Sequence, residues 1–162
     1  MQSDPDSMGG LHLNQLLSEC IADCELAAAI EARSRLVQIS NKRQLFRQGQ
    51  SPERLFLLKS GEVVLTSRHD DGSVLGFRAI PGSLIGLPAV AGNQPYTMTA
   101  TVTRYSELHA ISIWTFREIV GTNPRLSLRV LEILAAEVRS ARLLVTTALS
   151  SIASPKQLST SQ

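Results

Sequence analysis

Short runs of strand-forming residues, each ended by a glycine, a proline or a polar turn, fill the middle of this chain. Seven such runs lie between Val37 and about Ile113. In order they read LVQIS, QLFRQG, RLFLLKSG, EVVLTSR, SVLGFRAI, MTATVT and ELHAISI. Short strands at intervals of about ten residues are typical of a sandwich or barrel. These seven runs therefore predict a β-sandwich or β-barrel at the centre of the fold.

The segment HDDGSV gives the clearest turn between two of these runs. Asp71 and Gly72 stand at its centre, and glycine supplies the positive φ that a type I′ hairpin turn needs. We therefore expect a type I′ hairpin. Gly61, immediately before Glu62, predicts a second tight turn.

Apolar residues at helical spacing flank the strand section on both sides. The stretch from Leu11 to Leu36 predicts one or two helices, and SIWTFREIVGTN after Ile113 predicts a short amphipathic helix. A long helix is expected over about 124–152, with Asn123 able to cap its start and Pro124 tolerated in its first turn.

The predicted long helix carries two apolar rows. One is a heptad seam whose members step by 3 and 4: Leu131, Leu134, Val138, Ala141, Val145, Ala148 and Ile152. The other runs through Leu128, Ile133, Leu143, Leu144 and Leu149. The seam alone would suit packing on the chain's own strands, but two rows exceed what one sheet face normally covers. We therefore expect one row to meet the strands and the other to meet a second copy in a homodimer, and we assign the heptad seam as the dimer interface.

Composition and charge exclude several classes of protein. The chain of 162 residues is 43% hydrophobic and 19% charged, which is ordinary for a globular domain. A net charge of +2 is too small to serve as a footprint for nucleic acid. The N-terminus has no apolar signal region, and no apolar run approaches the ~18 residues of a membrane span. We expect a cytoplasmic protein with no membrane partner.

The reactive side chains do not form a catalytic or metal-binding pattern. His12, His69 and His109 are scattered, and none stands beside a nucleophile motif. Cys20 and Cys24 are four residues apart, which would place both on one side of a helix. Two thiols are too few for a metal site or a disulfide framework, so we interpret them as ordinary semi-buried cysteines. No enzyme activity, metal or cofactor is expected.

The glycine spacing resembles that of a known family. In LFRQGQSPERLFLLKSGEVVLTSRHDDGSVLGFRAIPGSLIGL, the turn glycines are Gly49, Gly61, Gly72, Gly82 and Gly86. From about Gln44 to Ala148 the chain is similar to the cyclic-nucleotide-binding domain of the catabolite-activator and FNR-type regulators, which also often open their central helix with Asn-Pro. The resemblance implies an α+β fold: an antiparallel β-roll or jelly roll with N-terminal helices and a long C-terminal dimerisation helix.

The resemblance also sets domain limits. It implies one sensor domain over residues 11–153, with the β-roll at about 37–113 and the long helix at about 124–152. Residues 1–10 and 154–162 are polar, and we expect both to be flexible tails.

The loop LIGLPAVAGNQPYTMTAT, residues 84–101, departs from that family. Nucleotide-binding members carry a glutamate for the ribose and an arginine for the cyclic phosphate, whereas these eighteen residues contain no charge. Leu87 stands at the glutamate position, and Tyr96-Thr97-Met98 stands at the Arg-Ser-Ala position. The candidate ligand-binding residues of this degenerate phosphate loop are Gly86, Leu87, Pro88, Ala89, Tyr96, Thr97, Met98 and Thr99.

Other positions also lack residues that nucleotide-binding or DNA-binding members of that family use. Ala141-Arg142 stands where such activators carry the Thr-Ser pair that meets the purine, and alanine cannot donate a hydrogen bond to a base. Arg78 and Arg104, on strands flanking the loop, could replace the missing arginine, but we expect both to be surface residues. Only SPKQLSTSQ follows Ala153, so we expect no helix-turn-helix and no direct DNA binding.

The residues and the resemblance together favour a non-enzymatic regulatory sensor domain for signal transduction, dimeric, with an uncharged or weakly anionic ligand or none. One alternative is a functional cyclic AMP or cyclic GMP receptor that holds the phosphate with backbone amides, Thr97 and Thr99. Another is a truncated transcription regulator that acts by pairing with full-length relatives.

Overall fold

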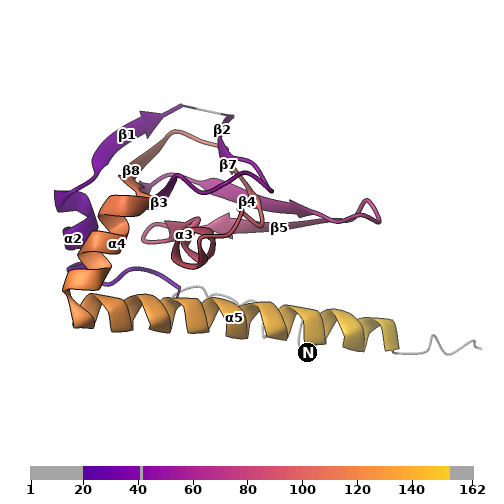
Figure 1. Ribbon diagram of the computed structural model, residues 1–162. Helices are drawn as coiled ribbons and strands as arrows, with labels where there is room; N and C mark the ends of the chain where they lie inside the picture. The colour runs from indigo at the N-terminus through magenta and orange to yellow at the C-terminus, as the bar shows by residue number, and fades with distance from the viewer. Residues whose placement is uncertain (1–19, 41, 154–162) are drawn as a thin grey trace, which may run out of the picture.

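The computed structural model describes residues 20–40 and 42–153. The expected tails 1–10 and 154–162 and the predicted helical residues 11–19 lie outside the described residues. Two antiparallel sheets form a roll, with α2 and α4 at one end and α5 running alongside (Figure 1). The elements are α2 Cys24–Ala32, β1 Arg35–Ile39, β2 Arg43–Phe46, β3 Arg54–Ser60, β4 Val63–Arg68, β5 Val74–Ala79, β6 Leu84–Ile85, α3 Leu87–Gly92, β7 Thr99–Val102, β8 Ser106–Ser112, α4 Ile113–Thr122 and α5 Pro124–Ala153.

Each sheet has four strands, in the orders β1-β8-β3-β6 and β2-β7-β4-β5. Every neighbouring pair is antiparallel. All seven predicted runs form strands, which confirms the α+β class and the antiparallel roll. The sequence does not predict β6, because its two residues are too few to show a period. This strand pairs with Phe56 and Leu57 of β3 and leads directly into α3.

The boundary between the first described helix and the first strand corrects two predictions. The helical pattern was expected to reach Leu36, but Leu36 pairs with His109 inside β1. The carboxylate of Asp23 accepts a hydrogen bond from the Leu26 N–H at 2.9 Å, so α2 begins only at Cys24. Cys20 therefore precedes the helix, and the two thiols do not share a helix face. Cys20 is half-buried and Cys24 is exposed.

The five turn glycines all have positive φ, between 83° and 95°, as the family spacing implies. The β4–β5 hairpin is confirmed, but its turn is not type I′. The Gly72 N–H donates to the His69 carbonyl at 3.0 Å, so Asp70 and Asp71 are the central residues, and neither has positive φ. The Asp71 carboxylate accepts from the Ser73 N–H at 2.8 Å. This local bond favours a turn in which Gly72 alone is left-handed.

The buried apolar side chains form two clusters. The helical cluster lies where α2, α3, α4 and α5 meet the first sheet, and it contains Leu26, Ile30, Leu55, Leu57, Leu84, Leu87, Val90, Ile111, Ile113, Phe116, Ile119, Leu126, Val130 and Ile133. The roll cluster lies between the two sheets, and it contains Ile39, Phe46, Phe56, Leu58, Val63, Ala79, Ile85, Ala89, Tyr96, Ala100, Val102 and Leu108. The β3 strand contributes to both clusters, which fixes the helices relative to the roll.

The start of α5 agrees with the sequence, because the Asn123 side-chain oxygen accepts from the Arg125 N–H at 3.0 Å and Pro124 is the first helical residue. The inward row of the helix is different from the predicted rows. Its fully buried residues are Leu126, Val130, Ile133 and Ala136. Of the second predicted row, Ile133 alone is fully buried, whereas Leu128, Leu143 and Leu149 are exposed.

Glu137 lies beside this inward row and gives the fold a pH dependence. Burial raises the pKa of its carboxyl from 4.5 to about 7. The folded state therefore holds a proton that the unfolded state releases between pH 4.5 and 7, so stability falls as pH rises through this range. Above pH 7 the loss is complete and of order 2–3 kcal/mol.

We expect Glu137→Gln to remove most of this slope and to stabilise the protein at pH 8. Urea unfolding at several pH values and one fixed protein concentration measures the effect. Glu132→Gln is the matched control, because Glu132 is an exposed carboxylate of the same helix, paired with Arg129, and it should leave the slope in place. Equal slopes for the parent and Glu137→Gln would contradict the assignment.

Candidate functional site

The phosphate loop of residues 84–101 begins with β6, continues through α3 and ends in β7. Gly86 has φ 91° and occupies the N-cap of α3, with Pro88 in the first turn. Asn93 ends the helix in the left-handed region, and its N–H donates to the Ala89 carbonyl. A short helix therefore starts directly after Gly86.

The ring of Tyr96 covers this loop from inside the roll. It stacks on Phe46 with ring centroids 3.7 Å apart and planes within 10°. A Cβ atom at Gly86 would lie 3.0 Å from the Tyr96 ring and 3.4 Å from the Phe46 ring, so both rings pack directly against the glycine backbone. Tyr96 is only 3% exposed. The space beside Gly86 on this side is occupied by aromatic carbon.

The Tyr96 hydroxyl is held by backbone. It donates to the Arg54 carbonyl and accepts from the Arg54 N–H at 3.4 Å. Burial raises the pKa of this hydroxyl above its usual value, so the side chain stays neutral. A neutral, hydrogen-bonded phenol offers no charge to an anion.

Leu87 faces a different part of the molecule. Its side chain is fully buried and belongs to the helical cluster, whereas Tyr96 belongs to the roll cluster. We expected Leu87 and Tyr96 to line the same ligand-binding site, but their side chains lie in two different clusters. The sequence could not reveal this, because the direction of the first side chain of a short helix depends on the packing around it.

The remaining loop residues differ in exposure. Pro88 and Thr97 are exposed, Met98 is half-buried and Ala89 is buried in the roll cluster. The Thr99 hydroxyl accepts a hydrogen bond from the Gln48 N–H at 3.0 Å. It therefore ties β7 to the turn that follows β2.

The two arginines considered as replacements both pair with Glu62. Arg78 lies 3.2 Å and Arg104 lies 2.9 Å from the same carboxylate oxygen, and both side chains are more than 70% exposed. The Thr103 hydroxyl donates to the other oxygen at 2.6 Å. These donors, Thr103 first and then Arg104, lower the pKa of Glu62. Both arginines are surface residues as expected, although Arg104 follows β7 rather than lying in a strand.

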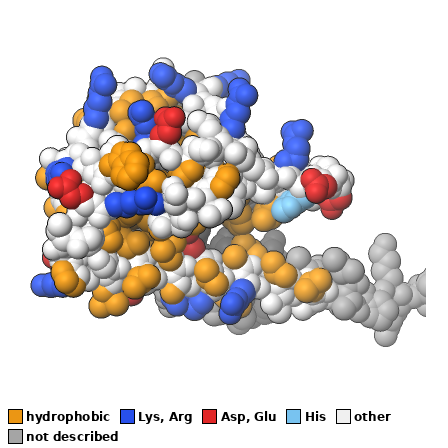
Figure 2. All heavy atoms as spheres, viewed as in Figure 1, with side chains coloured by type: hydrophobic (Ala, Val, Ile, Leu, Met, Phe, Trp, Pro, Cys, Tyr) orange, Lys and Arg blue, Asp and Glu red, His pale blue; other side chains and the backbone are white. Residues whose placement is uncertain are grey.

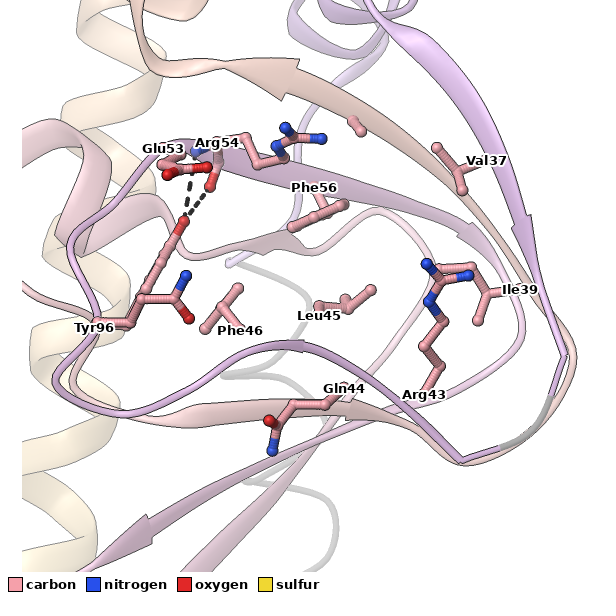
Figure 3. A pocket seen from close by; sticks show the side chains of 12 residues that line it. Val37, Ile39, Arg43, Gln44, Leu45, Phe46, Glu53, Arg54, Phe56 and Tyr96 are labelled. Carbon is pink, nitrogen blue, oxygen red and sulfur yellow. Dashed lines mark hydrogen bonds between the residues drawn. The ribbon is translucent and has the colours of Figure 1, made fainter.

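A pocket of about 250 Å³ opens between the edge strands β1 and β2, and Tyr96 forms part of its wall (Figure 3). Its apolar lining comes from Val37, Ile39, Leu45, Phe46, Phe56 and Ala110. Its polar lining comes from Arg43, Gln44, Gln50, Glu53 and Arg54. The sequence does not identify this set, because its members meet only when the edges of two different sheets come together.

Three members of the predicted heptad seam project from α5 into solvent: Leu131, Val138 and Val145 are between 51% and 62% exposed. Figure 2 shows hydrophobic side chains along the face of this helix beneath the roll. Leu134 packs partly on the helical cluster, and Ala141 is exposed. The side chains of Ala148 and Ile152 lie outside the described residues.

The described residues contain no group of three or more His, Cys, Asp or Glu side chains that could hold a metal ion. His69 is exposed at the hairpin, and His109 shares a 2.9 Å hydrogen bond with Ser34. Within residues 20–40 and 42–153, no helix is long and apolar enough to cross a membrane.

A comparison with protein families decides the relationship. Residues 36–123, more than half of the chain, match the cyclic nucleotide-binding domain. The chain belongs to this family. It is a regulatory domain like the sensor domains of the catabolite-activator type, which are not enzymes. A comparison with curated protein sequences found no match.

Solved structures share the fold. The catabolite activator protein of Thermus thermophilus has a TM-score of 0.68 and 21% identity, over 82% of this chain and 62% of that one. The Xanthomonas campestris global regulator CLP has a TM-score of 0.61 and 25% identity, over 80% and 63%. The N-terminal domain of a Streptomyces coelicolor transcriptional regulator has a TM-score of 0.58 and 24% identity, over 75% of this chain and 85% of that one. The chain thus spans less than two thirds of the first two proteins.

The opposite orientations of Leu87 and its neighbour Pro88 give a test of the loop. We expect Leu87→Ala to lower the free energy of unfolding by about 2–5 kcal/mol, because it leaves a cavity in the helical cluster. Pro88→Ala, at an exposed position, should cost less than about 1 kcal/mol. Urea unfolding measures both. A cost below about 1 kcal/mol for Leu87→Ala would show that the side chain does not fill this cluster.

Proposed function

We propose that this protein is a dimeric regulatory domain whose phosphate loop no longer binds cyclic nucleotides with micromolar affinity. The observation that supports the proposal best is the packing of Tyr96 and Phe46 on Gly86. A phosphate beside Gly86 would have to displace a buried ring that is stacked and hydrogen-bonded. The loop of residues 84–101 also offers no charged side chain to replace what is lost.

The energetic effect of the missing charges is large. A hydrogen bond to a charged group contributes about 1.5–3 kcal/mol. Without the family's arginine and glutamate, the site loses two such contacts, or roughly 3–6 kcal/mol. Each 1.4 kcal/mol is about tenfold in affinity, so a micromolar site would become millimolar or weaker.

Calorimetric titration with cyclic AMP and cyclic GMP tests this proposal. We expect no dissociation constant below about 10 μM for either nucleotide. Tighter binding would favour the rival function, a cyclic-nucleotide receptor, which the family match supports. That rival needs the Thr97 hydroxyl, so Thr97→Ala should then weaken binding.

The second part of the proposal is dimerisation through α5. Leu131, Val138 and Val145 are seven residues apart, which places them on one line along the helix, and all are more than half exposed. The inward row of α5 is separate from this line, so the helix can pack on the roll and on a second copy at once. A helix of 30 residues is about 45 Å long, which gives the partner an extended contact surface.

We expect the double variant Val138→Asp and Val145→Asp to be monomeric, because association would bury two carboxylates from each chain in an apolar interface. Size-exclusion chromatography with light scattering gives the mass directly. Ala135→Asp with Thr146→Asp is the matched control: both residues are exposed on an adjoining face of the same helix, and this variant should stay dimeric. A dimer that survives the Val138 and Val145 changes would place the interface elsewhere.

A further inference from the structure

The pocket between β1 and β2 has an apolar interior. Phe46 and Phe56 stack with ring centroids 6.3 Å apart, and both are at most 6% exposed. Leu45, Ile39, Val37 and Ala110 complete the apolar lining. Aromatic and aliphatic carbon in this arrangement suits the hydrocarbon part of a ligand.

The rim of the same pocket carries an excess of positive charge. Arg43 and Arg54 both line it, with Glu53 as its one carboxylate. Figure 3 shows Arg43 reaching from β2 toward Val37 and Ile39 of β1, and Arg54 extending alongside Phe56. Neither guanidinium forms an ion pair within the described part of the chain, whereas five other arginines there do: Arg33, Arg78, Arg104, Arg125 and Arg129. Two guanidinium groups beside an apolar cavity suit a carboxylate, which each can bind in a bidentate manner.

The volume limits the size of the ligand. About 250 Å³ is the volume of roughly eight water molecules in the liquid, or a molecule of about ten non-hydrogen atoms. It is also below the range of about 300–1,000 Å³ that is typical of sites for larger ligands. The enclosed space is therefore smaller than is typical for a nucleotide-sized ligand and suits a small carboxylic acid.

We propose that this pocket binds a small organic carboxylate, with its hydrocarbon part on Phe46 and Phe56 and its charge between Arg43 and Arg54. The pocket shares Tyr96 with the phosphate loop, but its other lining residues lie outside residues 84–101. The inference therefore goes beyond the proposed function and does not depend on the nucleotide result.

The pocket also contacts the loop through one residue. Tyr96 lines the pocket, packs on Gly86 and bonds the backbone of Arg54 through its hydroxyl. Arg54, which would hold the carboxylate, therefore lies two contacts away from the start of α3. Occupancy of the pocket should shift the backbone from Gly86 to Val90.

The test is a titration of the ¹⁵N-labelled full chain with phenylacetate and hexanoate, followed by amide chemical shifts. The neutral 2-phenylethanol is the matched probe without the charge. We expect a saturable shift of pocket amides with at least one carboxylate, with a dissociation constant of about 1 mM or below. The alcohol should bind about tenfold more weakly, because it cannot form charge-assisted bonds. Shifts at Gly86 to Val90 should follow the same curve.

Two variants test whether the arginines of the pocket bind the carboxylate group. Arg43→Gln and Arg54→Gln should each weaken the carboxylate about fivefold or more and leave the alcohol unchanged. Arg78→Gln, at another exposed arginine that lies outside the pocket, should change neither. The dispersion of the amide spectrum reports whether each variant is folded. The proposal is overturned if neither carboxylate gives a saturable shift up to about 10 mM, if the alcohol binds equally well, or if Arg78→Gln has the same effect.

Discussion

The contact between the Tyr96 ring, Phe46 and Gly86 is the constraint on which this site depends. The contact requires a glycine at position 86, because any Cβ there would press on both rings. Backbone bonds hold Tyr96 in place: its N–H donates to the Gln50 carbonyl at 2.9 Å, and its carbonyl accepts from the Gly49 N–H at 2.7 Å. The segment after α3 is therefore fastened to the turn between β2 and β3. One aromatic side chain closes the phosphate loop and forms the wall of the neighbouring pocket.

The strands were predictable because each is long enough to show its apolar pattern between turn residues. β6 was not, because two residues carry no pattern, and its place in the sheet follows from pairing with β3. The turn at Asp71-Gly72 shows a second limit. The glycine predicts a hairpin, but the turn type depends on which carbonyl the Gly72 N–H meets, and a two-residue motif does not specify that partner.

The sequence predicted where the candidate site lies along the chain, but it did not predict how the side chains of the site are oriented. The missing charges of residues 84–101 are visible in the sequence. The opposite orientations of Leu87 and Tyr96 are not, because they arise from packing against two different clusters. In α5, periodicity revealed two apolar rows, but the row that is buried coincides with neither of them. Leu126 and Val130 are buried because α4 packs on the first turns of α5, a tertiary contact without a local signal.

The inward row of α5 also divides the helix along its length. Among the side chains of α5 that the structure describes, Ala136 is the last that is fully buried, and those described after Glu137 are mostly exposed, so this half of the helix has less tertiary support than the first turns. Most of the stability of a helix in a protein comes from the packing of its apolar face rather than from the helix itself. The second half of α5 would then gain its order from a partner chain rather than from its own roll. Amide hydrogen exchange in this half would slow as protein concentration rises, so the exchange rate of these amides would measure dimer formation.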